Sequence, residues 1–388
     1  MSNTPTVNNN SLEEDTSGAT KAMQWFGVFF LIYLLIMAVG MIGTGFKAQT
    51  AGRAGELFEF ATNPFTGLLI GILGTSLIQS SSTVTSIIVG LVAGGLPVET
   101  AIPMVMGANM GTTITNTIVA MGHINKKKTF RRAFAAATVH DFFNLMAVLI
   151  FLPIEIMFGV LEKIGGMMAG LFIGVDASVK DANFIKPITK PVIGVFQDLS
   201  AIIYAPFANI ILIILGVLLI FVSITVVGKL LRRLLVGTAK EIMHKAIGRG
   251  PLSGIASGTI VTVLVQSSST TTSLMVPLAG TGKFRLKQIY PFTLGANIGT
   301  TITGLLAATA ATGANAIFAL QIALVHLSFN ILAVVVIFGI PFLRHIPLAG
   351  ANRLAKISAD NKLIALGYVL GVYFGIPFLL IWVFGLIG

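Results

Sequence analysis

Two nearly identical polar strings lie inside uncharged segments of this chain, and they restrict its fold more than any other feature. These serine strings read Gln79-Ser80-Ser81-Ser82-Thr83, within 67–95, and Gln266-Ser267-Ser268-Ser269-Thr270, within 253–282. Both segments are long enough to enter deeply into a bilayer, because an α-helix rises about 1.5 Å per residue. Clustered hydroxyl side chains favour a helix break, since they compete for backbone hydrogen bonds. Each segment is therefore predicted to be a re-entrant hairpin that turns at its string.

A second pair of matched strings follows the first pair. These asparagine strings read Gly107-Ala108-Asn109-Met110-Gly111-Thr112-Thr113 and Gly295-Ala296-Asn297-Ile298-Gly299-Thr300-Thr301. The asparagine comes 30 residues after the glutamine of the serine string in the first copy and 31 residues after it in the second. Together with Pro103 and Pro291, the strings predict broken membrane-spanning helices over 98–122 and 288–312.

The composition supports a membrane location. Hydrophobic residues make up 55% of the 388 residues and charged residues 10%, whereas a soluble domain carries about 25% charged residues. A net charge of +11 would favour a nucleic-acid partner in a soluble protein, but here the basic residues lie between the apolar segments. Cysteine is absent, which excludes disulfides and thiolate metal sites. The fold class is predicted to be an all-α polytopic membrane protein.

The positions of the charges predict how the segments cross the bilayer. We place the N-terminal tail inside, let both serine-string segments form hairpins and let the other apolar segments cross. In this arrangement, 19 of the 25 lysines and arginines lie on the inner side of the membrane. The two halves then run in opposite directions. Inverted repeats with discontinuous helices are typical of secondary transporters. Exchanging hairpin and crossing segment within each half gives the same loop orientation, so which segment is the hairpin stays open.

This topology divides the chain into five parts. They are a disordered cytoplasmic tail at 1–24, a first transmembrane repeat at 25–155, an extracytoplasmic connection at 156–202, a second inverted repeat at 203–340, and a basic cytoplasmic loop with a final transmembrane helix at 341–388. Within the second repeat, the basic stretch 229–249 is predicted to form an amphipathic helix on the inner surface.

The strings contain the groups that an ion site needs. The second half-helix of each hairpin would begin at the serines, where free amides and hydroxyls suit an anion such as phosphate or a carboxylate. Neutral carbonyl oxygens of glutamine and asparagine suit Na⁺. The alternative is that these small polar residues only pack helices together. Duplication of both strings argues against it, because packing needs small residues but not the same ones twice.

Further polar residues lie in the predicted span 133–155. His140 and Asn144 have counterparts in His326 and Asn330, whereas Asp141 corresponds to Leu327. An ionisable residue at membrane depth is a functional candidate by default. A structural hydrogen-bond network and a role in ion or proton movement remain equally open.

Enzyme chemistry finds no support in the sequence. The membrane segments hold no pair of carboxylates, no Cys/His cluster and no nucleophile-elbow motif, and the asparagine strings lack the lysine of a phosphate-binding P-loop. The chain is therefore expected not to be an enzyme and to use no cofactor, with Na⁺ as a coupling ion.

Over about 25–388, the chain resembles a bacterial member of the type II sodium-dependent inorganic phosphate cotransporter family. The resemblance rests on the serine and asparagine strings and on four further stretches. These are Thr115-Asn116-Thr117-Ile118-Val119-Ala120, Phe130-Arg131-Arg132-Ala133-Phe134, Thr138-Val139-His140-Asp141-Phe142-Phe143-Asn144 and Gln321-Ile322-Ala323-Leu324.

The resemblance implies Na⁺-coupled symport of inorganic phosphate into the cell by alternating access. Together with the residue chemistry, it predicts a phosphate site at Ser80, Ser81, Ser82, Ser267, Ser268, Ser269, Asn109 and Asn297. It predicts Na⁺ sites at Gln79, Thr83, Thr112, Thr113, Gln266, Thr270, Thr300 and Thr301. Candidates for coupling or structural support are His140, Asp141, Asn144, His326 and Asn330.

Three departures from the animal members stand out. The connection 156–202 is short and has no cysteine, unlike their larger disulfide-bearing loop. Animal members continue past the segment that corresponds to 364–387, whereas here the C-terminus is expected outside. Electrogenic members carry an aspartate after the first hairpin, where this chain has Ala93-Gly94-Gly95. One cation site is therefore expected to be missing, which favours electroneutral transport and leaves the stoichiometry open.

The expected location is a bacterial inner membrane, with multiple passes and a cytoplasmic N-terminus. The expected partners are phosphate, Na⁺ and the lipid bilayer but not nucleic acid, and a homo-oligomer is left open. An anion channel could use the same serine-lined constriction. A Na⁺-coupled transporter of another oxyanion or small anion is the other alternative. A sensor or assembly subunit would need a cytoplasmic signalling domain, and no segment supplies one.

Overall fold

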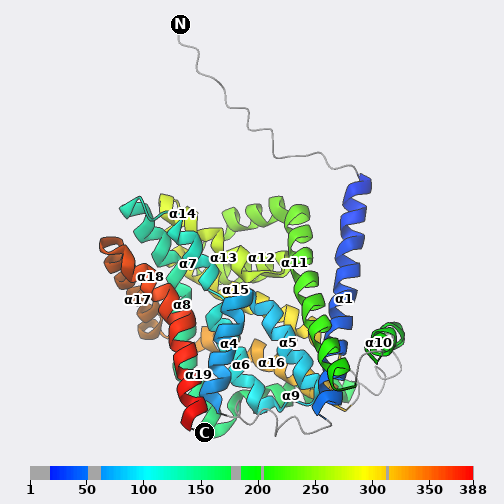
Figure 1. Ribbon diagram of the computed structural model, residues 1–388. Helices are drawn as coiled ribbons and strands as arrows, with labels where there is room; N and C mark the ends of the chain where they lie inside the picture. The colour runs from blue at the N-terminus through cyan, green and yellow to red at the C-terminus, as the bar shows by residue number, and fades with distance from the viewer. Residues whose placement is uncertain (1–17, 51–62, 176–184, 202–204, 312–313, 388) are drawn as a thin grey trace.

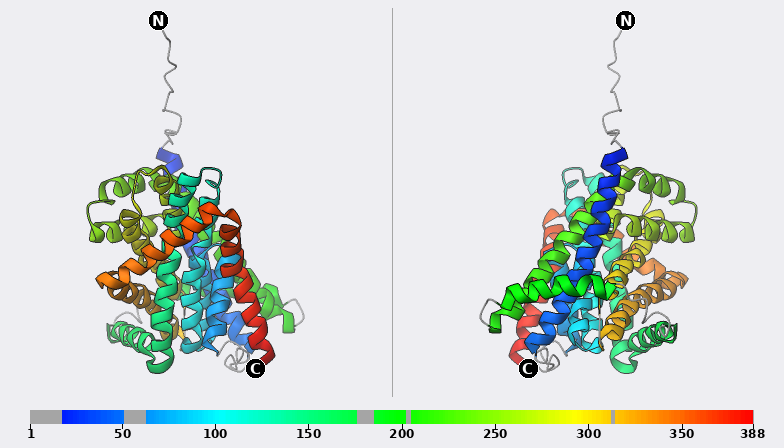
Figure 2. Two further views of the ribbon diagram at one scale, coloured as in Figure 1. Left: turned by 90° about the vertical axis from the view of Figure 1, so that its left-hand side faces the viewer. Right: turned by 90° about the vertical axis from the view of Figure 1, so that its right-hand side faces the viewer.

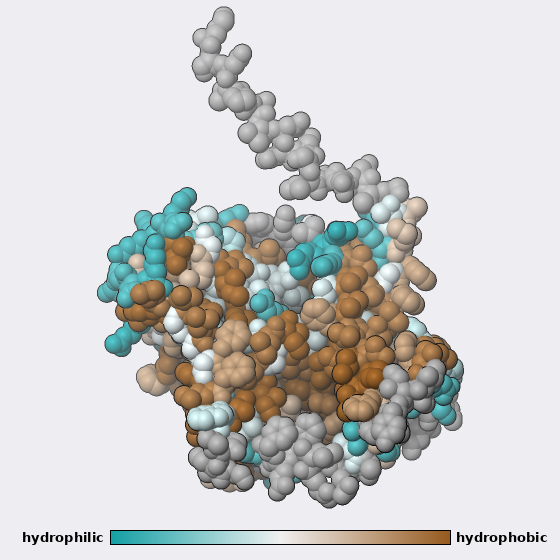
Figure 3. All heavy atoms as spheres, viewed as in Figure 1, coloured by the Kyte–Doolittle hydropathy of each residue, from teal (hydrophilic) through white to brown (hydrophobic). Residues whose placement is uncertain are grey.

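The structure is a computed structural model that describes residues 18–50, 63–175, 185–201, 205–311 and 314–387, and these residues are helical without any strand (Figure 1). Five helical segments are long and apolar enough to cross a membrane: Gly18–Thr50, Lys127–Phe158, Phe207–Leu235, Ala316–Phe338 and Lys362–Phe384. The face in Figure 3 is mostly hydrophobic across its middle, with hydrophilic residues gathered at its upper end. Such a belt is what lipid-facing helices require. The predicted polytopic membrane protein is confirmed.

The helices fall into two halves and a C-terminal part. The first half contains α1 (Gly18–Thr50), α4 (Pro64–Ile78), α5 (Ser81–Gly94), α6 (Val98–Gly111), α7 (Ile114–Met121) and α8 (Lys127–Phe158). Two connecting helices follow, α9 (Val160–Val175) and α10 (Ile185–Ala201). The second half contains α11 (Ala205–Ala246), α12 (Pro251–Val265), α13 (Ser268–Ser273), α14 (Met275–Thr281), α15 (Leu286–Ala308) and α16 (Ala316–Ala333), which continues into the π-helical turn η1 (Val334–Phe338). The last part contains α17 (Pro341–Asp360), α18 (Lys362–Leu370), the π-helical turn η2 (Gly371–Gly375) and α19 (Ile376–Ile387).

Corresponding helices of the two halves make corresponding contacts. The first hairpin helix packs on the asparagine-string helix in both halves, α4 on α6 and α12 on α15. A Cβ atom at Gly107 would collide with the Leu68 carbonyl oxygen, and one at Gly295 would collide with that of Ile255. Glycine therefore lets each pair of backbones approach closely, which is the usual basis of helix packing in membranes.

Both serine strings form the predicted turns. The break between α4 and α5 lies at Gln79, with φ of 57°, and that between α12 and α13 lies at Gln266, with φ of 53°. These are the two non-glycine residues with positive φ in the described part of the chain. A left-handed non-glycine residue costs of order 1–3 kcal/mol, and such strain gathers at functional sites. Ser80 and Ser267 then cap the next helices by accepting hydrogen bonds from the backbone N–H groups of Thr83 and Thr270, each at 3.2 Å.

The asparagine strings differ from the prediction in one copy. The break in the first copy is confirmed, because α6 ends at Gly111 and α7 begins at Ile114. The prediction of a break in the second copy is wrong, since α15 runs without interruption through Gly295–Thr303. Threonine side chains bond back to the helix in both copies, but only Thr113 also contacts Tyr373 Oη, at 2.8 Å. This partner from the last span stabilises the first break, and α15 shows no equivalent contact among the described residues.

The polar connections are more helical than predicted. The connection 156–202 contains α9 and α10, while its residues 176–184 lie outside the described part. The stretch 229–249 is not a separate amphipathic helix, because α11 continues to Ala246 with no proline after Pro206 to stop it. The basic loop after 341 is largely the helix α17, which buries Ala351 and Ala355 and packs on α8. Of the predicted tail, 18–24 belong to α1 and 1–17 lie outside the described residues.

The two ends of the molecule carry different parts of the fold. In Figure 1 the visible chain begins at the upper end and finishes at the lower end. The hairpin α4–α5 lies in the lower half of this view and α12–α13 in the upper half. Figure 2 shows α10 lying across α1 near the lower end, and Tyr33 of α1 donates a hydrogen bond of 3.1 Å to the Ile188 carbonyl of α10.

Candidate functional site

The serines after each hairpin turn are buried but not paired. Ser81 is 2% exposed and Ser268 is 2% exposed, and their neighbours Ser82 and Ser269 are also buried. The side-chain hydroxyls of these four serines make no hydrogen bond to another described residue. Their oxygen atoms are not among the fully enclosed, unpaired oxygens of the described chain, so solvent or a ligand can reach them. These hydroxyls are therefore available to a ligand, and their assignment to the phosphate site stays a prediction.

Further unpaired hydroxyls surround the first serine string. Thr75 and Ser76 lie one turn before Gln79, and Thr85 and Ser86 lie one turn after the serines. The side-chain oxygens of all four are buried without a hydrogen-bond partner in the described chain. Thr262 of α12, which stands where Thr75 stands in α4, is unpaired in the same way. Unpaired buried polar groups of this density indicate a place for an ion or ordered water.

The remaining residues of the serine strings support the turns. Thr83 donates a hydrogen bond of 2.8 Å to Ser80 Oγ, and Ser267 donates one of 3.0 Å to Thr270 Oγ1. Gln266 accepts from Thr303 at 3.0 Å, whereas Gln79 is exposed. Oxygen lone pairs remain on these groups, so their assignment to Na⁺ stays a prediction.

The asparagine strings meet the histidines of the opposite half. His140 Nε2 lies 2.5 Å from Asn297 Oδ1, and His326 Nε2 lies 3.0 Å from Asn109 Oδ1. Asn144 joins the two, because it accepts from Asn297 Nδ2 at 2.8 Å and donates to the Asn109 carbonyl at 2.9 Å. The side chains of Asn109 and Asn297 are therefore held by neighbours in this structure. That the two asparagines bind phosphate stays a prediction. Their contacts favour a role in positioning other residues.

Each of the two histidines in this network has one ring nitrogen without a hydrogen-bond partner in the described residues. The Asn297 and Asn109 side chains donate through Nδ2, so their Oδ1 atoms accept from the histidine Nε2–H groups. The Nδ1 atoms of His140 and His326 then carry free lone pairs, and both are buried without a hydrogen bond in the described residues. They can accept a hydrogen bond from water or from a protonated oxyanion.

The threonines of the asparagine strings bond within their own helices. Thr112 and Thr300 donate to the carbonyls four residues earlier, at 3.1 Å and 3.0 Å. Thr113 and Thr301 donate to the carbonyls three residues earlier, at 3.2 Å and 2.7 Å. Their hydrogens are used but their oxygens can still accept or bind a cation, so their Na⁺ assignment also stays a prediction.

Each hairpin packs against the other half of the chain. Asn116 of α7 donates a hydrogen bond of 2.9 Å to Thr272 of α13, and α5 packs on α15. The two serine strings therefore each lie beside the asparagine-string region of the opposite half. This arrangement is what a single site built from both halves requires.

A sequence model of the Na⁺/Pi-cotransporter family matches residues 34–176 and 218–347. Each matched stretch contains one serine string and one asparagine string. The chain belongs to the Na⁺/Pi-cotransporter family. The sodium-dependent phosphate transport protein 2B of Homo sapiens is 33% identical over 99% of this chain and 69% of its own length. The 2B protein of Pongo abelii has the same values, and the 2A protein of Rattus norvegicus is 31% identical over 92% of this chain and 66% of its own. No solved structure matches the chain.

As a member of this transporter family, the chain is not an enzyme, as predicted. The part of it that the structure describes holds no group of three or more His, Cys, Asp or Glu residues that could bind a metal ion. The Ala93-Gly94-Gly95 stretch ends α5, and Gly95 has φ of 116°, which disfavours any residue with a Cβ.

One positively charged side chain beside the second serine string was not predicted from the sequence. Arg232 of α11 donates a hydrogen bond of 2.7 Å to Thr270 Oγ1 through Nη2. An arginine suits an oxyanion because its planar guanidinium can donate several hydrogen bonds at once. The basic stretch 229–249 predicts a helix on the membrane surface rather than a contact with the serine string, and the contact depends on the unbroken course of α11. No sequence pattern marks it.

Asp141 connects the last span to the break between α6 and α7. It accepts hydrogen bonds from Tyr368 at 2.9 Å and from Tyr373 at 2.5 Å, and Tyr373 also contacts Thr113. A cavity of about 80 Å³ adjoins this cluster. The two tyrosines were not predicted, because their relation to Asp141 depends on how the last span packs. These contacts favour a structural role for Asp141.

Proposed function

We propose that this chain is a secondary active transporter that couples inward symport of inorganic phosphate to Na⁺ by alternating access. The observation that carries the proposal is the set of hydroxyls without a hydrogen-bond partner on the buried residues at and around the serine strings. Membership in the Na⁺/Pi-cotransporter family, and relatives named as sodium-dependent phosphate transport proteins, support the choice of phosphate and Na⁺ as substrates.

The anion would bind between the two strings. At the first string, the backbone N–H groups at the start of α5 carry partial positive charge, and Ser81 and Ser82 add hydroxyl donors. At the second string, Ser268 and Ser269 supply hydroxyls, and Arg232 supplies a formal positive charge beside them. Phosphate has enough oxygen atoms to accept hydrogen bonds from both sides.

Sodium ions would bind the neutral oxygens next to the anion. Gln79, Gln266 and the string threonines offer carbonyl and hydroxyl oxygens without a carboxylate. Moving phosphate into a site away from water is costly unless a cation accompanies it. Bound Na⁺ lowers this cost, and phosphate in turn raises the affinity for Na⁺ by the same factor. That reciprocity is the physical basis of symport, and the Na⁺ stoichiometry depends on how many such sites fill.

Alternating access would use two inverted repeats. The reciprocal contacts of His140 with Asn297 and of His326 with Asn109 support a two-fold relation between the halves. We place the N-terminus in the cytoplasm and the C-terminus outside a bacterial inner membrane, on the basis of the lysine and arginine distribution.

Uptake of radiolabelled phosphate into proteoliposomes tests the proposal. A Na⁺ gradient should drive accumulation above the external concentration, and replacing Na⁺ with choline should abolish it. Uptake unchanged in choline at several pH values would contradict Na⁺ coupling. Flux that never exceeds equilibrium would favour the anion channel instead, and stronger competition by arsenate or sulfate than by phosphate would favour another oxyanion.

A further inference from the structure

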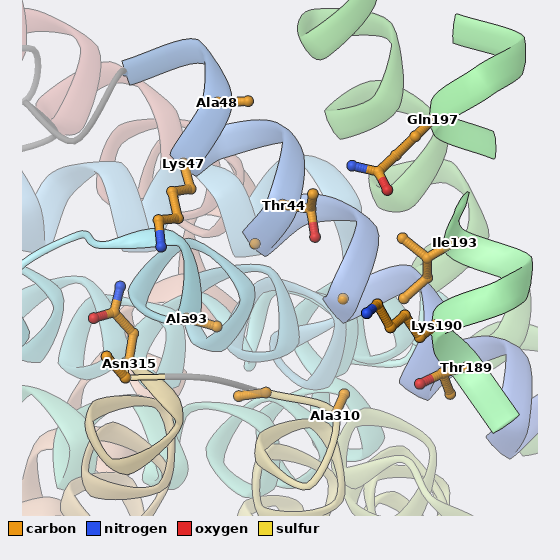
Figure 4. A pocket seen from close by; sticks show the side chains of 14 residues that line it. Thr44, Lys47, Ala48, Ala93, Thr189, Lys190, Ile193, Gln197, Ala310 and Asn315 are labelled. Carbon is orange, nitrogen blue, oxygen red and sulfur yellow. The ribbon is translucent and has the colours of Figure 1, made fainter. Parts of the chain in front are cut away.

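One cavity of the described chain lies away from the serine strings. It has a volume of about 610 Å³ and is lined by α1, α5, α10 and the region around the end of α15. Figure 4 shows Lys47 of α1 and Lys190 of α10 among its lining residues, with Asn315 facing Lys47. Thr44 and Gln197 add polar groups to the wall.

The charged side chains that the structure describes in this cavity are of one sign. Among the described residues that line it are two lysines and no acidic residue. Neither Lys47 nor Lys190 forms an ion pair with another described residue. Two acidic residues, Glu99 and Glu162, line a separate neighbouring cavity of about 240 Å³, which shares only Asn315 with the first. Burial, with Glu99 and Glu155 nearby, raises the pKa of Glu162.

Helix dipoles do not account for both lysines. Lys47 lies in the last turn of α1, where a cation is favoured by the negative end of the helix. Lys190 is the sixth residue of α10, beyond the turn in which the helix dipole acts, so the dipole has little effect on it. What the two share is the cavity, and a cavity lined by one sign of charge raises the local concentration of oppositely charged solutes.

We propose that this cavity is an anion-binding vestibule that collects phosphate before it reaches the serine strings. The inference rests on the proposed phosphate transport and adds a second binding place to it. The cavity lies at the end of the molecule opposite the start of α1. In the proposed orientation, the end with the cavity is the outer end. Ala93 in its wall belongs to α5, which carries Ser81 at its other end, about 18 Å away by the rise of the helix.

The oxyanion in the vestibule could be free phosphate or the phosphate of an anionic lipid headgroup, because α10 lies on the outside of the helix bundle. The cavity extends inward to α5 and the end of α15, which favours the free ion. The test must separate the two sources.

The test compares phosphate uptake by the wild type, Lys47→Gln, Lys190→Gln and the double variant in proteoliposomes. The matched control is Lys163→Gln, an exposed lysine of α9 at the same end of the molecule but outside the cavity. We expect KM for phosphate to rise roughly tenfold in the double variant, with kcat within about twofold of the wild type. Added choline chloride at constant Na⁺ should raise KM of the wild type and the control but not of the double variant.

Wild-type KM in the double variant would overturn the vestibule. So would lysine variants that keep wild-type KM in phosphatidylcholine and lose only a stimulation by phosphatidylglycerol, because the cavity would then hold lipid. All variants should keep the wild-type thermal unfolding midpoint, since both lysines are exposed. If the wild type takes up no phosphate under a Na⁺ gradient, the proposed transport fails. Equilibrium binding of radiolabelled phosphate to the purified wild type and double variant then decides on the vestibule separately.

Discussion

His140 donates a hydrogen bond from Nε2 to Asn297 Oδ1 at 2.5 Å, and this bond joins α8 of the first half to α15 of the second. The bond between His326 and Asn109, at 3.0 Å, joins α16 to α6 in the reciprocal direction. Each asparagine string is thus held by a histidine of the opposite half. The geometry of the two strings depends on the interface between the halves, so movement of one half against the other would reach the site.

Asn297→Ala should destabilise the protein by about 1–3 kcal/mol, because it leaves the buried His140 Nε2 without an acceptor. Asn109→Ala should have a similar effect. Since Asn144 links the two, the double variant should deviate from additivity by about 0.5 kcal/mol or more. Unfolding free energies in detergent measure this. The control is Asn352→Ala, an exposed residue that bonds only to its own helix, and equal stability of Asn297→Ala and this control would contradict the network.

Ser81→Ala and Ser268→Ala should each lower kcat/KM for phosphate by roughly tenfold or more, since each removes a hydrogen bond to a charged ligand. Folding should be unaffected, because neither hydroxyl has a protein partner among the described residues. Ser358→Ala is the matched control, as Ser358 is buried and unpaired but lies in α17. Uptake kinetics check the result. Wild-type kinetics in both string variants would remove these serines from the site.

The sequence predicted the parts of this site that local chemistry determines. Both hairpin turns follow from hydroxyl-rich strings in apolar segments, and the structure places them at Gln79 and Gln266. The sequence could not distinguish the two asparagine strings, because both combine the same residues. Only tertiary contacts do so, through Tyr373, which is 260 residues from Thr113.

Dependence on tertiary contacts also explains why the sequence did not predict the role of Arg232 or the cavity. Arg232 reaches Thr270 because α11 continues through the basic stretch 229–249 as far as Ala246. Thr75 and Thr262 occur at matched positions in the two hairpins, so their duplication was a usable signal. The vestibule depends on how α10 packs on α1, which no pattern in 156–202 reveals.

Arg232→Gln should raise KM for phosphate roughly tenfold, because it removes a charge-assisted donor beside the second serine string. Arg233→Gln provides the control on the same helix, since Arg233 is also exposed and makes no hydrogen bond to another described residue. The measurement is phosphate uptake at saturating Na⁺. Equal KM in the two variants would show that the positive charge near the string does not contribute to binding.

Asp141→Asn should keep uptake within about twofold of the wild type, because an amide can still pair with both tyrosine hydroxyls, accepting from one and donating to the other. Asp141→Leu, which introduces the residue found at the corresponding position 327, should lower stability by about 2–5 kcal/mol through two lost bonds. Uptake assays and unfolding midpoints distinguish these effects. A well-folded Asp141→Asn protein without transport would instead assign Asp141 to ion or proton coupling.

The central claim is that both serine strings hold the same phosphate ion. An experimental structure in the presence of Na⁺ and phosphate tests it most directly. We predict tetrahedral density between the two hairpin turns, within hydrogen-bond distance of Ser81 or Ser82 and also of Ser268 or Ser269, with smaller cation density beside it. Phosphate density in contact with only one string, or bound elsewhere while both strings hold water, would contradict the account.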